Sequence, residues 1–298
     1  MTTIVRVAVL LVLVLVVDPR AASADGITVG LFAPTAPFPS TSARVELATR
    51  LGDHVGKALG KTGSGKVFAR GGDFAAAVRK GEVGVALVDA AYLAVAGGNY
   101  TVIAAAVRGG DTTHGWQLVA RGTDKLGGLK GKRVLVPGIG GREPDFVLNA
   151  LFGGEVPKDY FAKIETAPDT VSALAALGLG KADAAVVPAG VELPSGAVVV
   201  LKLPSLSGPV LVTYGSVTAQ QRQTLAAALT SFKGDPTIAG FKPADPDAVK
   251  QIARRFVVAA KRGPLAVPAI RLLVGDLVEG RKLVIERTPV TAFAAKPR

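Results

Sequence analysis

The sequence predicts an α/β fold of two lobes, each built on a mostly parallel sheet flanked by helices. Short apolar segments alternate with Ala-rich amphipathic segments from residue 27 onward, which is the pattern of strands joined by crossover helices. Two polar or Pro- and Gly-rich segments, residues 109–115 and 203–209, interrupt this alternation. If the chain passes from one lobe to the other at both segments, the lobes are joined by two hinge crossings.

The N-terminal residues predict export from the cytoplasm. Arg6 precedes the unbroken apolar run 7–17, and the small residues 22–24 follow it as a cleavage pattern. The run is about half of the ~20 residues that a membrane-spanning helix needs. We therefore expect residues 1–24 to be a cleaved signal peptide and the mature chain to begin at Asp25 outside the cytoplasm.

The predicted elements follow one another in a regular order, each an apolar or amphipathic run bounded by turn residues. The expected strands are residues 27–32, 66–70, 83–88, 102–107, 116–121, 133–137, 161–166, 184–188, 197–203 and 210–214. The expected helices are residues 43–59, 74–80, 90–96, 144–152, 168–177 and 219–232. With the two crossings, the first lobe is expected over 25–112 and 206–298 and the second over 113–205.

Composition argues against several classes of function. The chain has no cysteine, so it has no disulfide framework and no thiol for lipid attachment. Its two histidines, His54 and His114, and the lack of a Gly-x-Ser-x-Gly motif predict no catalytic residue, no metal site and no enzyme activity. Aromatic residues make up 5% of the chain and form no basic, aromatic platform, which argues against nucleic acid.

One segment, residues 60–67, imitates a phosphate-binding P-loop. Val67 stands where that motif needs a hydroxyl residue, and the segment follows a helix and precedes a strand, which is the reverse of the usual order. We expect no nucleotide and no cofactor, and interpret the segment as a flexible turn.

Basic residues concentrate at the C-terminal end of the chain. The net charge is +12, and residues 250–298 hold 11 basic and 3 acidic residues. Apolar residues lie between the charges, so we expect helices and a final strand that dock on the first lobe. The basic side chains would then contact an anionic membrane surface or an acidic partner, or would form a solvated face. We expect the protein to be a monomer.

Candidate ligand-binding residues lie in the turns after strands, because ligands of open α/β sheets bind beyond the carboxyl ends of the strands. In the turn 138–142, glycines let a ligand approach backbone N–H groups, and the guanidinium offers a bidentate contact to a carboxylate or phosphonate. The alternative is that the glycines only turn the chain and that the polar residues cap helices or face solvent. The candidates are Phe38, Ser40, Thr41, Asp73, Asp89, Tyr92, His114, Gly140, Gly141 and Arg142.

Several stretches in the expected order resemble a known family, the phosphate- and phosphonate-type periplasmic solute-binding proteins of ABC importers, which have the type 2 periplasmic-binding fold. The matching stretches are residues 72–78, 80–94, 129–134, 173–185 and 202–209. Family members that bind phosphonates carry Ser and Thr hydroxyls in the turn where this sequence has Gly138–Arg142. A carboxylate at Asp89, on the family's pocket edge, suits a ligand that also carries an amine.

The resemblance implies a binding protein that closes on a small polar solute, anionic or zwitterionic, and delivers it to an ABC-type membrane permease. Two alternatives remain open at this point. One is a periplasmic sensing module that signals to a membrane receptor kinase, and the other is an exported enzyme.

Overall fold

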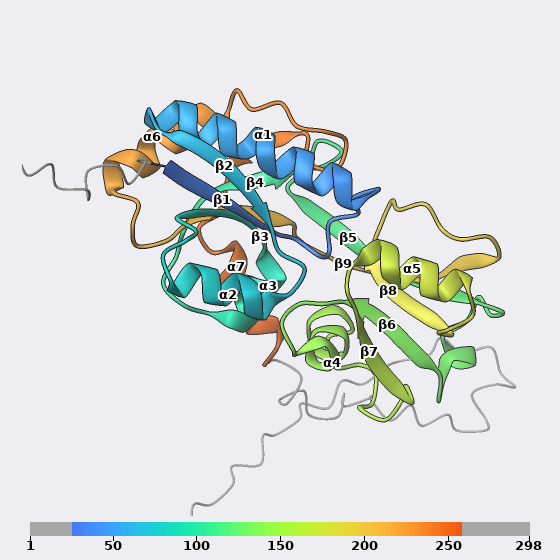
Figure 1. Cartoon of the computed structure of the whole chain (residues 1–298). Helices are drawn as coiled ribbons and strands as arrows, with labels where there is room; N and C mark the ends of the chain where they lie inside the picture. The colour runs from blue at the N-terminus through green and yellow to red at the C-terminus, as the bar shows by residue number, and fades with distance from the viewer. Residues whose placement is uncertain (1–25, 258–298) are drawn as a thin grey trace, which may run out of the picture. The chain divides into compact units, whose positions relative to one another are not determined.

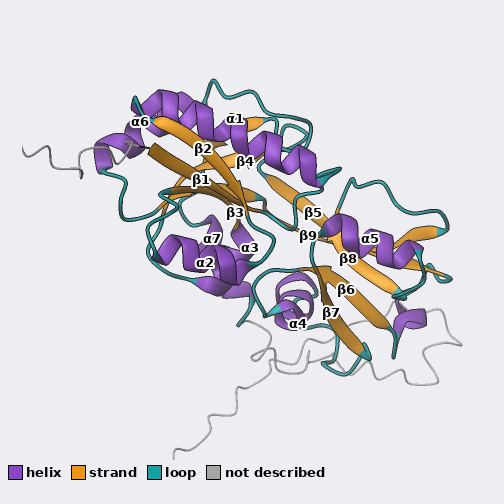
Figure 2. Cartoon of the chain, viewed as in Figure 1, coloured by secondary structure: helices purple, strands orange, loops and turns teal. Residues whose placement is uncertain are grey.

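Two β-sheets with helices packed against them make up residues 26–257, the part of the chain that this computed structural model describes (Figure 1 and Figure 2). The first sheet has the order β11-β4-β10-β3-β1-β2. Its strands are β1 (Gly26–Phe32), β2 (Thr62–Val67), β3 (Val85–Asp89), β4 (Thr101–Val107), β10 (Pro209–Thr213) and β11 (Gly240–Pro243). The second sheet has the order β7-β6-β8-β5-β9. Its strands are β5 (Thr113–Arg121), β6 (Arg133–Pro137), β7 (Lys163–Ala167), β8 (Ala184–Pro188) and β9 (Ala197–Ser207).

The helices fall close to the predicted segments. They are α1 (Thr41–Leu59), α2 (Gly71–Arg79), α3 (Ala90–Ala96), α4 (Glu143–Asp145), α5 (Thr170–Gly178), α6 (Ala219–Leu229) and α7 (Ala248–Arg255), with a 3₁₀ turn η2 (Leu126–Leu129) and a π-helical segment η3 (Phe146–Leu151). Among residues 26–257, no helix combines the length and the apolar character that a membrane span needs. The predicted signal peptide and the predicted structure after residue 257 lie outside the described residues.

The two-sheet α/β class is confirmed, but the sheets are mixed rather than mostly parallel. In the first sheet β1 pairs in parallel with β2 and β3, whereas β10 runs antiparallel to β3 and β4. In the second sheet β6 is parallel to β7 and β8, whereas β5 is antiparallel to β8 and β9. The antiparallel pairs with β3 and β8 arise because β5 and β10, the strands that enter each sheet directly after a crossing, run against the strands that are joined by crossover helices.

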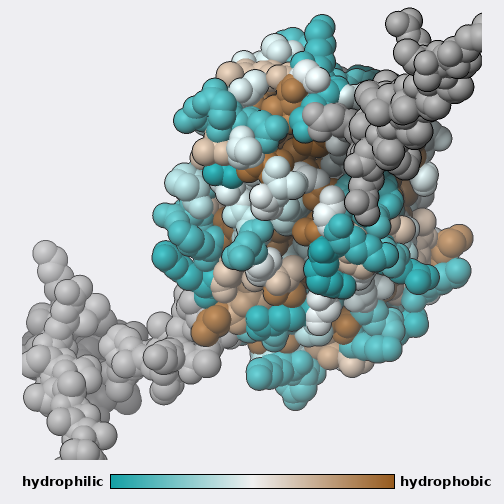
Figure 3. Space-filling view, turned by 60° about the vertical axis from the view of Figure 1, so that its left-hand side comes forward, coloured by the Kyte–Doolittle hydropathy of each residue, from teal (hydrophilic) through white to brown (hydrophobic). Residues whose placement is uncertain are grey.

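Both faces of the first sheet are buried, which explains why its central strands are continuous apolar runs. Alternate residues point to opposite faces, so Val85 and Leu87 of β3 pack in the cluster that contains α1 and α6. Ala86 and Val88 pack in the cluster that contains α2, α3 and α7. Hydrophilic residues cover much of the face drawn in Figure 3, with smaller hydrophobic areas between them.

The two crossings fall within the two predicted segments but are shorter than expected, because residues 113–115 belong to β5 and residues 203–207 to β9. The first is the tight turn between β4 and β5, closed by the Arg108–Asp111 bridge with Gly109 and Gly110 at φ 58° and 91°. The second is Gly208, between β9 and β10. A Cβ on Gly208 would lie 2.7 Å from the His114 ring, so a larger residue would have to displace that ring where the two crossings run side by side.

The P-loop-like segment is not a flexible turn, because most of it forms β2 at the edge of the first sheet. A Cβ on Gly65 would lie 2.1 Å from the Ala48 carbonyl of α1, and one on Gly52 of α1 would lie 2.4 Å from Ser64. The glycines therefore let helix and strand approach closely. Their spacing resembles a phosphate-binding loop but serves packing.

Candidate ligand-binding site

A mostly buried loop after β1, residues 33–39, forms hydrogen bonds with residues next to both sheets. Asp89, at the end of β3, holds this loop, since its two carboxylate oxygens accept from the backbone N–H and the hydroxyl of Thr35, each at 2.8 Å. Thr35 and Asp89 are 8% and 2% exposed. The loop is therefore fixed from the side of the first sheet before it contacts the second.

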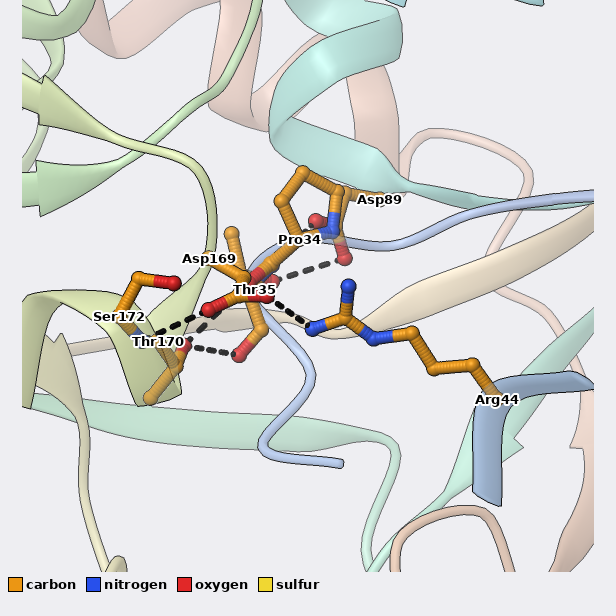
Figure 4. Close-up of polar contacts among 7 residues, drawn as sticks. All are labelled: Pro34, Thr35, Arg44, Asp89, Asp169, Thr170 and Ser172. Atoms are coloured by element: carbon orange, nitrogen blue, oxygen red, sulfur yellow. Dashed lines mark hydrogen bonds and ion pairs between the residues drawn. The ribbon is translucent and has the colours of Figure 1, made fainter. Parts of the chain in front are cut away.

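The N-terminus of α5, which packs against the second sheet, contacts the other side of this loop (Figure 4). The Thr170 hydroxyl donates to the Thr35 carbonyl at 2.9 Å, and the Thr170 backbone N–H donates to the Pro34 carbonyl at 3.0 Å. Arg44 of α1 donates to Asp169 at 2.6 Å, while Asp169 also accepts from the Ser172 backbone N–H at 2.7 Å and so caps α5. We call these contacts the interlobe bridge.

Electrostatics at the bridge centre on Asp89. Burial raises the pKa of Asp89 to about 7, against the opposing effects of the Thr35 hydrogen bonds and the charges of Arg44 and Arg108. Burial alone would raise the pKa of Asp169, but the hydrogen bonds from Ser172 and the charge and hydrogen bond of Arg44 together outweigh it, so this pKa lies below its usual value. The bridge thus contains the Arg44–Asp169 ion pair and, on the other side of the loop, the Asp89 carboxyl group with its pKa of about 7.

Next to the bridge lies a cleft of about 570 Å³, lined from both sheets. It is bounded by the ends of β1 and β2 on one side and by the turns after β6 and β7 on the other, as expected for an α/β ligand site. Its lining residues are Phe32, Pro34, Ala69, Arg70, Gly71, Gly138, Gly140, Gly141, Glu143, Thr166, Ala167 and Pro168. This volume is within the range of small-molecule sites, about 300–1,000 Å³.

The glycine turn after β6 lines this cleft, but its backbone donors are not free. The N–H groups of Ile139 and Gly141 both donate to Glu143 Oε1, at 2.8 and 3.1 Å. Gly140 has φ 104°, and a Cβ there would lie 3.0 Å from the Tyr92 ring of α3. The expectation of bare N–H donors facing a ligand is therefore wrong for these two groups, because the chain supplies its own carboxylate.

Arg142 is not among the residues that line the cleft. Its guanidinium pairs with Asp145 at 2.8 Å and lies over the Phe256 ring at 5.1 Å. These contacts hold the side chain next to the end of α7.

The remaining predicted residues are spread over several local environments. Phe38 is 1% exposed and packs in the core below Arg44, whose guanidinium carbon lies 5.6 Å from its ring centre. The Ser40 hydroxyl caps α1 by accepting from Ala43, and Thr41 is the exposed first residue of that helix. Asp73 is exposed in the first turn of α2. Of the predicted set, only Gly140 and Gly141 line the cleft itself.

Tyr92 and His114 do not line the cleft, and they lie in different places. The Tyr92 hydroxyl donates to the Gly71 carbonyl at 3.1 Å, and its ring packs on Phe32 and Phe74. His114 lies at the first crossing, beside a separate hollow of about 740 Å³ that Arg108 also lines. Burial and the charge of Arg108 lower the pKa of His114 to about 4, so the ring is neutral at pH 7.

Sequence reasoning missed Glu143, Arg70, Thr35 and the Asp169–Thr170 pair. A usable signal existed for the last, because Asp169 precedes a helical run and is followed by Ser172 at cap spacing. Thr35 lies in the turn after the expected strand 27–32, so this kind of segment was predicted but the residue was not. Within residues 26–257 no group of three or more His, Cys, Asp or Glu side chains is placed to hold a metal ion.

Two sheets linked by two crossings, with a cleft between them, define the class of two-lobed α/β binding proteins. Residues 35–261 match the family model described as "ABC transporter, phosphonate, periplasmic substrate-binding protein". The chain belongs to this family, whose members are periplasmic substrate-binding components of transporters rather than enzymes. No curated protein has a sequence that matches the chain.

Solved structures share the fold at low sequence identity. A binding protein component of an ABC phosphonate transporter from Pseudomonas aeruginosa is 16% identical, with a TM-score of 0.61, and the match covers 81% of this chain and 91% of that one. PhnD1 from Prochlorococcus marinus in complex with methylphosphonate is 14% identical, with a TM-score of 0.61 and coverages of 78% and 98%. A Xanthomonas citri protein bound to ATP is 14% identical, with a TM-score of 0.59 and coverages of 78% and 97%.

Proposed function

We propose that the protein captures a small polar solute, anionic or zwitterionic, in the cleft beside the interlobe bridge and delivers it to an ABC-type membrane permease. The observation that carries this proposal is that the cleft and the bridge share their walls. Pro34 and Pro168 line the cleft, and their neighbours Thr35 and Asp169 make the bridge. A ligand in the cleft therefore favours the same approach of the sheets that forms the bridge.

The mechanism that follows is hinge closure about the two crossings. We propose residues 25–112 and 206–298 as one lobe and residues 113–205 as the other, with the turn at Arg108–Asp111 and Gly208 absorbing the rotation. In the open form the Thr35 carbonyl and the α5 N-terminus would be solvated. On closure these groups lose their bound water and form the Thr170 hydrogen bonds instead. Ligand binding supplies the rest of the free energy that stabilises the closed form.

The solved relatives bound to methylphosphonate and to ATP hold ligands with phosphorus oxyanions. Together with the family, they support a polar solute for this chain. We propose further that residues 1–24 direct export and that the mature protein acts in the periplasm as a monomer without enzyme activity. Contact of the basic C-terminal segment with an anionic membrane surface is part of the same proposal.

A thermal-shift screen of the mature protein against anionic, zwitterionic and cationic metabolites tests this function. A solute at about 100 times its dissociation constant stabilises the fold by about 2.7 kcal/mol. The expected result is at least one solute that raises Tm in a concentration-dependent way. If no solute of any charge raises Tm, the binding function is refuted.

A further inference from the structure

The glycine turn of the cleft contains an anion-binding site that the chain fills itself. Two backbone N–H groups converging on one oxygen is the arrangement by which a turn holds a ligand oxyanion. Here Glu143 Oε1 takes that place, with bonds of 2.8 Å from Ile139 and 3.1 Å from Gly141. Pro144 follows directly and fixes the backbone at the start of α4. An oxyanion can reach these donors only by displacing a carboxylate tethered to the same turn.

Glu143 is a buried carboxylate that lacks a cationic partner. Its side chain lines the cleft and the residue is 4% exposed. Among residues 26–257 it forms no salt bridge, and its second oxygen, Oε2, accepts no hydrogen bond. A carboxylate oxygen that no residue of the protein uses can accept a charge-assisted hydrogen bond from a ligand. The unfilled acceptor therefore favours a ligand that brings a cationic N–H group into the cleft.

The opposite wall carries one complementary charge. Arg70 and Glu143 are the two ionisable residues among those that line the cleft, and Arg70 comes from the loop after β2. Arg70 is exposed and makes no ion pair with any residue in the described range. An unpaired guanidinium on one wall and an unpaired carboxylate on the other match a ligand with charges of both signs.

We propose that Glu143 is the specificity-determining residue of this cleft. Its carboxylate excludes a bare oxyanion from the glycine turn and selects a small solute whose ammonium or guanidinium group donates to Glu143. A solute that also carries an oxyanion places that group towards Arg70. This inference rests on the proposed function, because it concerns the ligand of the same cleft.

The test uses pairs of probes that differ by one ammonium group, namely aminomethylphosphonate with methylphosphonate and glycine with acetate. Calorimetry compares the wild-type chain with Glu143→Gln, which keeps the shape and an acceptor oxygen, and with Glu143→Ala, which frees the Ile139 and Gly141 N–H groups. In the wild type the amine-bearing member of a pair should bind at least tenfold more tightly. In Glu143→Gln this preference should fall at least tenfold, and in Glu143→Ala methylphosphonate should bind at least tenfold more tightly than in the wild type.

The results of this test distinguish a failure of the role proposed for Glu143 from a failure of the proposed binding function. Wild-type protein that binds methylphosphonate at least as tightly as its amine counterpart overturns the role of Glu143 while supporting a binding function. If the wild type binds none of the four probes, methylphosphonate binding that appears in Glu143→Ala supports the exclusion, and its absence there refutes it. Thermal unfolding of each variant confirms that the tested chains are folded. If Glu143→Ala does not fold, the loss of amine preference in Glu143→Gln remains the test, and an unchanged preference there refutes the role of Glu143.

Discussion

Replacing Thr170 with valine should weaken the interlobe bridge while nearly preserving the shape of the side chain. Valine is nearly isosteric with threonine, and residue 170 is fully buried at 0% exposure. The substitution removes the hydroxyl that donates to the Thr35 carbonyl at 2.9 Å and leaves the backbone N–H bond to Pro34 in place. The variant therefore tests the hydrogen bond between the Thr170 hydroxyl and the Thr35 carbonyl, without removing the other contacts of the bridge.

The expected loss follows from the burial of the acceptor. A buried carbonyl left without its partner costs about 1–3 kcal/mol, so the ratio of closed to open molecules should fall by a factor of about 5 to 150. Apparent ligand affinity should fall by the same factor if the open form predominates in the variant, because only the closed form completes the cleft.

Labelling can report this change directly, since the chain has no cysteine of its own. Cysteines placed at the exposed positions Lys57 and Lys132 carry a fluorophore pair, one on α1 and one just before β6. The matched control is Thr224→Val, which removes a hydroxyl that bonds within α6 to Gln220. If Thr170→Val and the control give the same distance distribution and the same ligand affinity, the bridge does not stabilise closure.

Three further predictions follow from the same structure. The pKa of Asp89 is raised from 3.8 to about 7 in the folded protein, so between these pH values the native state holds a proton that the unfolded chain releases. The free energy of unfolding should therefore fall as pH rises from about 4 to about 7, by up to about 1.4 kcal/mol per pH unit. Asp89→Asn should flatten this slope in pH-dependent Tm measurements. Gly65→Ala should lower the free energy of unfolding by about 1–3 kcal/mol or more in urea titrations, whereas Gly72→Ala, where a Cβ meets nothing within 4 Å, should change it by less than about 1 kcal/mol. Arg142→Ala should leave ligand affinity within about twofold of the wild type in calorimetry, because its guanidinium is held by an exposed ion pair, and a loss of more than tenfold would return Arg142 to the binding site.

The fold was largely predictable because burial on both faces makes the strands continuous apolar runs. β6 and β8 have the predicted bounds, and so does α3. The sequence pattern did not predict most of β2, because this strand is rich in glycine rather than in apolar residues. Its glycines suggested a loop, whereas they allow the strand to pack closely against α1. β11 and α7 were not placed individually, since a four-residue strand and an eight-residue helix near the basic segment carry little periodicity of their own.

The site was predictable by segment and not by residue. The turns after the strands do form the cleft, because topology alone brings the carboxyl ends of parallel strands together. Which side chain faces the cleft depends on local contacts that one sequence does not reveal. Arg142 and Glu143 are adjacent, yet Arg142 lies over Phe256 while Glu143 turns inward to the N–H groups of its own turn.

A common principle links the turn and the bridge. At both places a carboxylate of the chain occupies backbone donors that a ligand anion would otherwise use: Glu143 takes those of its turn, Asp169 takes the N–H of Ser172 at the start of α5, and Asp89 takes that of Thr35. Asp169 is neutralised by Arg44, and Asp89 is buried beneath the loop, so neither is available to a ligand. Glu143 alone of the three lines the cleft, and for this reason we propose that its carboxylate, together with Arg70 on the opposite wall, selects the ligand.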